Sequence, residues 1–103
     1  MEILRKTHEK IKTDQYEYSR HALDQSILRN LPVKEIKEAL LSGIELIEEY
    51  PDDFYGPSRL VLGFTEEKKP VHIVCSHPSR GLVKIITVYI PDEKSWKNFR
   101  IRL

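Results

Sequence analysis

The fold is decided by PVHIVCSHPSRGLVKIITVYIP, residues 70–91. In its first part, from Val71 to Ser76, apolar side chains alternate with a second set that includes His72. After the break HPSRG, residues 82–90 are almost wholly β-branched, apolar or aromatic. Alternation and β-branched runs are typical of strands, and Pro and Gly interrupt them. The stretch therefore predicts two antiparallel strands joined by a turn.

The register between these two strands decides which polar side chains share a face. Successive side chains of a strand point to opposite faces, so Thr87 and Tyr89 lie on the same face. A register that pairs His72 with Thr87 places His72 beside them, whereas a shift of one residue moves it to the other face. The turn is several residues long and does not dictate its own type. Both registers are therefore open on this evidence.

The chain before this stretch predicts helices. Residues 2–12 have apolar side chains at roughly helical spacing, which is typical of a weak amphipathic helix. Residues 16–30 predict a better helix, with Ser19 as its N-cap and His21 at the margin of its apolar arc. The apolar stripe of that helix is expected to consist of Leu23, Ile27 and Leu31.

A third helix and two further strands complete the expected fold. Pro32 begins the helix and Gly43 occupies the position of its C-terminal cap. Residues 44–50 and 58–65 predict strands, and alternation in the second puts Arg59 on a face that is not the deepest core. The pattern predicts an α+β domain, with N-terminal helices packed on one face of a single antiparallel sheet of four to five strands.

The C-terminal end predicts a turn and one more strand. Residues 92–96 form the turn, and Trp96 is expected to pack back on the sheet. Residues 97–103 alternate again, as in an edge strand with a basic outer face.

Length and composition limit the class of protein. With 103 residues the chain fits one domain. The sequence has no apolar run long enough for a membrane span, and its charged N-terminus is unlike a secretory signal, so the expected location is the cytoplasm. The single cysteine excludes an internal disulfide. Residues 1–67 carry 9 Lys/Arg against 14 Asp/Glu, whereas residues 68–103 carry 8 against 2, which suggests an anionic partner for the basic half.

Metal and cofactor motifs are not apparent in the sequence. No glycine-rich phosphate loop, H-E-x-x-H or paired C-x-x-C occurs. His72, Cys75 and His77 are the nearest approach to a metal set, but strand alternation sends His72 to the face opposite the other two. We therefore expect no metal and no cofactor, and we expect Cys75 to be a core thiol.

Two histidines are candidates for proton transfer near neutral pH. If the helix that carries His21 packs over the strand that carries His72, the two could approach each other with Arg59, Thr87 and Tyr89 nearby. Such a set contains an acid, a base, hydroxyl groups and a cation, which are the parts that metal-free RNA cleavage requires. The alternative is that buried His, Thr and Tyr only satisfy one another's hydrogen bonds.

The residues that carry a family resemblance extend over residues 16–96. They are Ser19-Arg20-His21-Ala22, Leu41-Ser42-Gly43, Glu49-Tyr50-Pro51, Leu62-Gly63, Pro70-Val71-His72, Ile86-Thr87-Val88-Tyr89 and Trp96. Together they resemble the bacterial and archaeal family called domain of unknown function 4258. The resemblance implies a fold similar to the RelE and barnase-like ribonuclease toxins and a metal-independent ribonuclease activity, often in a toxin–antitoxin pair. It implies as site residues His21, His72, Thr87 and Tyr89, with Arg59 a less certain member.

The resulting hypothesis is an endoribonuclease whose partners are RNA or the ribosome and a cognate antitoxin protein. Its catalytic residues are His21, His72 and Tyr89. Its substrate contacts are Arg59, Thr87, Lys84 and Arg20. Further cations that could line the same groove are Arg80, Arg100 and Arg102. The alternative is a non-catalytic domain that binds a protein or a nucleic acid. The arm 1–15 and the tail 97–103 lie outside the resemblance, and each could bind an antitoxin, complete a homodimer or simply pack.

Overall fold

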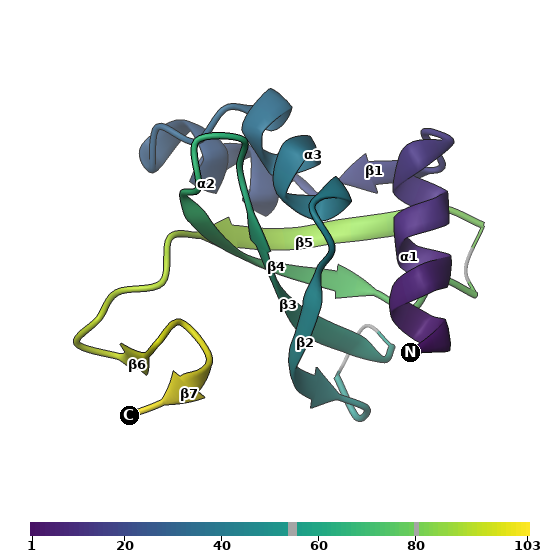
Figure 1. The fold of residues 1–103 in the computed structure, drawn as a ribbon. Coiled ribbons are helices and arrows are strands. Elements are labelled where there is room, and N and C mark those ends of the chain that lie inside the picture. The colour runs from purple at the N-terminus through teal and green to yellow at the C-terminus, as the bar shows by residue number, and fades with distance from the viewer. Residues whose placement is uncertain (54–55, 80) are drawn as a thin grey trace.

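Three helices and a five-stranded sheet share one hydrophobic core in the computed structural model, which describes residues 1–53, 56–79 and 81–103 (Figure 1). Arg80, one of the expected groove cations, lies outside the described residues. The helices are α1 Glu2–Lys12, α2 Arg20–Leu28 and α3 Val33–Leu41. The strands are β1 Tyr16–Tyr18, β2 Glu45–Tyr50, β3 Ser58–Phe64, β4 Pro70–Ser76, β5 Val83–Tyr89, β6 Trp96–Lys97 and β7 Ile101–Arg102. In the described part of the chain, no helix has the length and apolar character needed to cross a membrane.

The main sheet is mixed, which corrects the expectation of a purely antiparallel sheet. Its order is β1-β5-β4-β3-β2, and the neighbours from β2 to β5 are antiparallel, but β1 pairs with β5 in parallel. Residues 16–18 were expected to be helical. Asp14 adopts a left-handed φ of 58° just after α1, and the next residues run extended along β5. Two half-buried tyrosines flank the exposed Glu17, which is the alternation of a strand.

The pairing of β4 with β5 answers the register question. His72 pairs with Tyr89 and Val74 with Thr87, and a bulge precedes the pair Cys75–Ile85. The register differs by two residues from a pairing of His72 with Thr87. A shift of two preserves the face of every side chain. Of the two registers left open by the sequence, the structure therefore has the kind that places His72, Thr87 and Tyr89 on one face.

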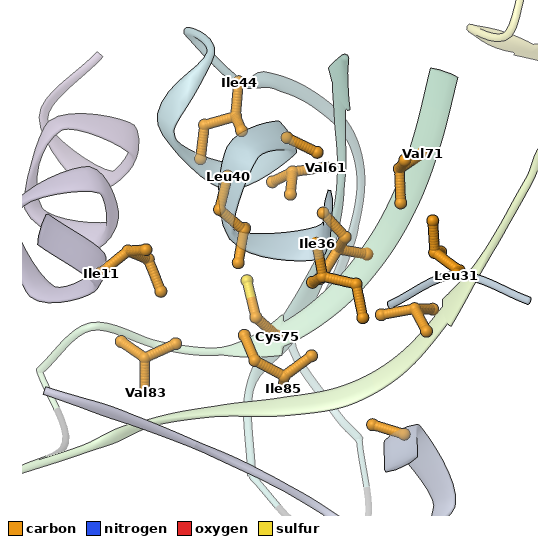
Figure 2. Packing of buried hydrophobic residues seen from close by; sticks show 14 residues of the cluster. Ile11, Leu31, Ile36, Leu40, Ile44, Val61, Val71, Cys75, Val83 and Ile85 are labelled. Atoms are coloured by element: carbon orange, nitrogen blue, oxygen red, sulfur yellow. The ribbon is translucent and has the colours of Figure 1, made fainter. Parts of the chain in front are cut away.

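The other face of the sheet carries the core beneath the helices. Val71, Ile73 and Cys75 of β4 point into it, and Figure 2 shows the side chain of Cys75 beside Ile85, with its sulfur directed toward Leu40 of α3. The third helix lies where it was expected, and its buried residues are Ile36, Ala39 and Leu40. Since neighbours along β4 alternate, this core sends His72 to the opposite side of the sheet.

Helix α2 begins where expected, but it buries a different face from the one predicted. The Ser19 hydroxyl accepts from the Ala22 amide at 3.0 Å, which confirms the N-cap, and it donates to the Ile86 carbonyl at 2.8 Å. The Ser19 amide also donates to the Ile85 carbonyl at 2.9 Å, so two hydrogen bonds anchor the start of α2 to β5, and the small residues Ala22 and Ser26 are the buried ones of the helix. The predicted apolar stripe is wrong for Leu23 and Ile27, which are 42% and 79% exposed.

The tail forms a separate hairpin instead of an edge strand, which corrects that prediction. Strands β6 and β7 pair only with each other, and Asn98 and Phe99 form the turn between them with φ values of 52° and 64°. The Arg100 amide donates to the Lys97 carbonyl at 3.0 Å across this turn. Two successive left-handed residues match the right-handed twist of a tight hairpin. As predicted, Trp96 is buried on the sheet.

We predict that Gly63→Ala destabilises the protein by about 1–3 kcal/mol, the range for overpacking a core. A Cβ at Gly63 would lie 2.7 Å from the Ala39 carbonyl carbon and would overlap the carbonyl oxygen, so α3 would have to move away from β3. The matched control is Gly81→Ala, where a Cβ meets nothing within 4 Å. Chemical denaturation of both variants measures the difference, and equal stabilities would contradict the close packing of α3 on β3.

Candidate functional site

A cluster of polar side chains lies on the sheet face opposite the helices. It comprises Glu48 and Tyr50 of β2, His72 of β4, Tyr89 of β5 and Arg102 of β7. Figure 1 shows helices α2 and α3 on one side of the sheet and the β6–β7 hairpin on the other. The hairpin therefore covers the face on which His72 lies.

His72 is fully buried, and both of its ring nitrogens have partners. Its Nε2 lies 2.6 Å from the Phe99 carbonyl oxygen, and its Nδ1 lies 3.1 Å from the Tyr89 hydroxyl. A carbonyl oxygen can only accept, so Nε2 carries the proton. Burial lowers the pKa of His72, although the Phe99 carbonyl and the Glu48 carboxylate act in the opposite direction. The ring is therefore neutral at pH 7, and its Nδ1 accepts a hydrogen bond from Tyr89.

Tyr89 is the half-buried end of this chain of hydrogen bonds. Burial raises the pKa of its hydroxyl, Glu48 raises it further, and the guanidinium groups of Arg102 and Arg29 oppose the shift. The phenol is thus protonated at neutral pH and donates to His72. The Phe99 carbonyl thus orients the His72 imidazole, and the imidazole accepts a hydrogen bond from the Tyr89 hydroxyl. Enzymes activate hydroxyl groups by this arrangement.

Glu48 holds the cluster to the hairpin. Its carboxylate accepts from the Tyr50 hydroxyl at 2.6 Å and from two nitrogens of Arg102 at 3.0 and 2.8 Å. These bonds, Arg102 first, lower the pKa of Glu48 to about 2. Burial and the neighbouring Glu48 raise the pKa of Tyr50 to about 12.

A second guanidinium–carboxylate pair lies beside the first. Arg100 donates to the two oxygens of Glu45 at 2.9 and 2.7 Å. Glu45 and Glu48 are three residues apart, a spacing that would separate them on a regular strand. The bulge between Leu46 and Glu48 restores both carboxylates to the same face, opposite Leu62 and Leu60 of β3.

Aromatic rings close the site from the hairpin side. The Trp96 ring meets the His72 ring edge to face, with centroids 4.6 Å apart, and the Arg102 guanidinium lies 4.6 Å from the centroid of Trp96. Phe99 packs edge to face on Phe64 of β3 at 6.2 Å. The rings exclude water from His72, which explains the direction of its pKa shift.

The structure brings together only some of the predicted site residues. His72 and Tyr89 are in direct contact, and Thr87 lies half-buried on the same face. The structure does not bring His21 to His72: His21 is exposed on α2, while His72 faces away from the helical core with both nitrogens bonded within the cluster.

The predicted cations are dispersed. Arg59 is 2% exposed on the helix side of the sheet, opposite Cys75, where its Nη1 donates to the Ser76 carbonyl at 3.1 Å. We expected Arg59 to lie near His72 and Tyr89, away from the deepest core. This prediction is wrong, because the pairing of Arg59 with Cys75 places its side chain on the core face of β3. Lys84 lies 3.6 Å from Glu17, and Arg20 is exposed at the start of α2.

The described residues contain no group of three or more His, Cys, Asp or Glu side chains that could hold a metal ion. Cys75 is fully buried on the core face, and burial raises the pKa of its thiol to about 11. It is a protonated core residue at neutral pH.

Sequence reasoning missed Glu48, Tyr50 and the Phe99 carbonyl as members of the site. Alternation alone separates Glu45 from Glu48, and the sequence of β2 does not reveal its bulge. The left-handed turn at Phe99 falls on a bulky residue, where glycine or asparagine would have indicated it.

Comparison with known proteins gives one match. No curated protein and no solved structure matches the chain. The family model described as Domain of unknown function (DUF4258) matches residues 18–90. This span includes Glu48, Tyr50, His72 and Tyr89, and it excludes α1 and the hairpin that carries Phe99 and Arg102. Because the match covers more than half of the sequence, the chain belongs to the DUF4258 family.

Proposed function

We propose that this protein is a metal-independent endoribonuclease of the toxin–antitoxin type, with a RelE-like or barnase-like fold, that acts through Tyr89 and His72. The observation that carries the proposal is the chain of hydrogen bonds from the Phe99 carbonyl through His72 to the Tyr89 hydroxyl. It supplies a neutral, oriented base behind a phenol that is only half-buried. The expected partners are RNA, free or on the ribosome, and a cognate antitoxin protein.

In the proposed reaction Tyr89 relays a proton to His72. The ribose 2′-hydroxyl gives its proton to the Tyr89 oxygen, while the Tyr89 proton moves to Nδ1 of His72. The 2′-oxygen forms a bond to phosphorus, the bond from phosphorus to the 5′-oxygen breaks, and that oxygen takes a proton from water. The hydroxide left behind takes the proton from Nδ1 of His72, which restores the neutral ring. The Glu48 carboxylate favours the imidazolium that forms, as its effect on the pKa of His72 indicates.

Cations near Tyr89 can offset the charge that develops on the phosphate. Arg102 belongs to the cluster that contains Tyr89, so its guanidinium group can influence a phosphate bound there, and Arg102 and Arg29 both act to lower the pKa of the Tyr89 hydroxyl. Thr87 shares this face and could contact the ribose, and the exposed Lys84 and Arg20 are candidates for more distant phosphates. Because of their positions, His21 and Arg59 have no step in this scheme.

We predict that the purified protein cleaves RNA in the presence of EDTA and that Tyr89→Phe lowers the rate roughly 10²- to 10⁴-fold, the usual contribution of general base catalysis. His72→Gln should lower it similarly, because the relay then has no base. The matched control is Tyr18→Phe, which removes a buried hydroxyl that has no hydrogen-bond partner within the described structure. Gel assays with free RNA and with ribosomes measure the rates. Absence of cleavage by the unmodified protein on both substrates would refute the proposal.

We also predict a pH dependence of stability that comes from His72. Its pKa is lowered in the folded state, so the unfolded chain binds more protons once the pH falls below about 6.5, and stability falls with it until the lowered pKa is passed. The charged and titratable groups around His72 are Glu48, Tyr89 and Arg102, of which Glu48 loses its own contribution only as the pH falls from about 4.5 toward 2. Urea unfolding at several pH values should show a shallower decline below pH 6.5 in His72→Gln. An identical decline in both proteins would contradict the assignment.

A second candidate function, a protein-binding domain, is favoured by the outer face of α2. Leu23, Ile27 and Leu28 are 42%, 79% and 76% exposed on this nine-residue helix. Adjacent exposed apolar side chains are typical of surfaces that bind protein. The simplest occupant in a purified sample is a second copy of the chain.

For this candidate we predict a concentration-dependent dimer that the double variant Ile27→Ser, Leu28→Ser abolishes. The control is Leu82→Ser, because Leu82 is 46% exposed on a different part of the surface. Light scattering across a range of concentrations measures the mass. A protein that is monomeric throughout, or a dimer that the double variant leaves intact, would contradict it.

A further inference from the structure

The β6–β7 hairpin lies outside the DUF4258 match, yet it supplies the atom that orients His72. Its contacts with the sheet are few in kind. They are the Phe99 carbonyl on His72, the rings of Trp96 and Phe99, and the two guanidinium–carboxylate pairs Arg100–Glu45 and Arg102–Glu48. The hairpin has two residues in each strand and shares no strand pairing with the main sheet. Since an isolated hairpin is marginal in water, its order depends on these contacts.

The two ion pairs are open to solvent. The side chains of Arg100 and Glu45 are 42% and 47% exposed, and those of Arg102 and Glu48 are 58% and 27% exposed. Exposed pairs contribute little to stability and are screened by salt, although fork-to-fork geometry favours them. The attachment of the hairpin should therefore weaken as ionic strength rises.

The turn of the hairpin works against the attachment. Phe99 has a φ of 64°, a conformation that a bulky side chain rarely adopts. Such strain persists only where surrounding contacts impose it. Here the contacts are the hydrogen bond from His72 and the packing on Phe64, and both are lost if the hairpin leaves the sheet. Opening therefore removes two of the contacts that hold Phe99 in this conformation, whereas the Arg100–Lys97 hydrogen bond lies within the turn itself.

We propose that residues 96–103 form a releasable clamp that fixes His72 as its Nε2–H tautomer, with Arg100 and Arg102 as positioning residues that hold the clamp closed. In the closed state Nε2–H of His72 donates a hydrogen bond to the Phe99 carbonyl, and Nδ1 is left to accept from Tyr89. In the open state Nε2 loses this partner, water reaches the ring, and the tautomer is no longer fixed. The effect of the clamp on RNA cleavage rests on the proposed function, whereas its effect on His72 does not.

The experiment uses Trp96, the only tryptophan in the chain, as a reporter of the closed state. Trp96 is 4% exposed, so acrylamide should quench its fluorescence weakly in the unmodified protein at low salt. In the double variant Arg100→Gln, Arg102→Gln we expect a severalfold rise in the quenching constant. The nitrogen chemical shifts of His72 should move from a single Nε2–H tautomer toward a mixture. The matched control is Lys94→Gln, Lys97→Gln, which removes two exposed cations that have no ion pair among the described residues.

Salt provides a second measurement on the unmodified protein. Rising sodium chloride should increase the quenching of Trp96 in the unmodified protein, while the double variant should respond little because its ion pairs are already gone. Far-UV circular dichroism should stay unchanged in both, since the main sheet and the helices do not depend on the hairpin. If RNA is cleaved, kcat should fall with KM nearly constant in the single variant Arg100→Gln, which weakens the clamp and leaves the Arg102 guanidinium in place.

The outcomes separate the two proposals. If Trp96 stays shielded and His72 keeps one tautomer in the double variant, the clamp is refuted, whatever the activity. If Trp96 becomes exposed and the tautomer is lost in a protein that cleaves no RNA, the clamp stands and the proposed function fails.

Discussion

The alternation of β4 is the constraint on which both sides of this molecule depend. Val71, Ile73 and Cys75 enter the core under the helices from the central strand of the sheet, between Val61 of β3 and Ile85 of β5. Because successive side chains of a strand alternate between the two faces, His72 must then lie on the other face. A polar ring on that face needs partners, and only the neighbouring strand and a covering segment can provide them. Tyr89 and the C-terminal hairpin fill these two roles.

Parity explains which parts of the structure could be predicted from sequence. The shared face of His72, Thr87 and Tyr89 was predictable only as one of two alternatives, because a shift of one residue would separate them. The observed pairing of His72 with Tyr89 is an even shift, which keeps them together. Arg59 follows the same rule, since its pairing with Cys75 places it in the core. Its position was mistaken because alternation divides the side chains of β3 between two faces without showing which face meets the helices.

The other differences between the predicted and the observed structure arise where a specific hydrogen bond or a bulge overrides the apolar pattern of the sequence. The apolar spacing of α2 predicts Leu23 and Ile27 inside, but the bonds of Ser19 to Ile86 and Ala22 fix the rotation that puts Ala22 inside. Small residues on that side let the helix approach β5 closely. Likewise, alternation in β2 separates Glu45 from Glu48, and only the bulge unites them. Bulges and helix rotations depend on tertiary contacts that no local period encodes.

The identity of the group that orients His72 affects its chemistry. A carboxylate in the place of the Phe99 carbonyl would stabilise the imidazolium strongly and raise the pKa of the ring, whereas a carbonyl fixes the tautomer with a smaller effect. With burial as the largest influence, His72 stays neutral and can still accept a proton. Glu48 is near enough to favour the imidazolium, but its carboxylate oxygens accept hydrogen bonds from Arg102 and Tyr50. The hairpin thus both supplies the orienting carbonyl and neutralises the nearest carboxylate, so the basicity of His72 is set by a segment that lies outside the family match.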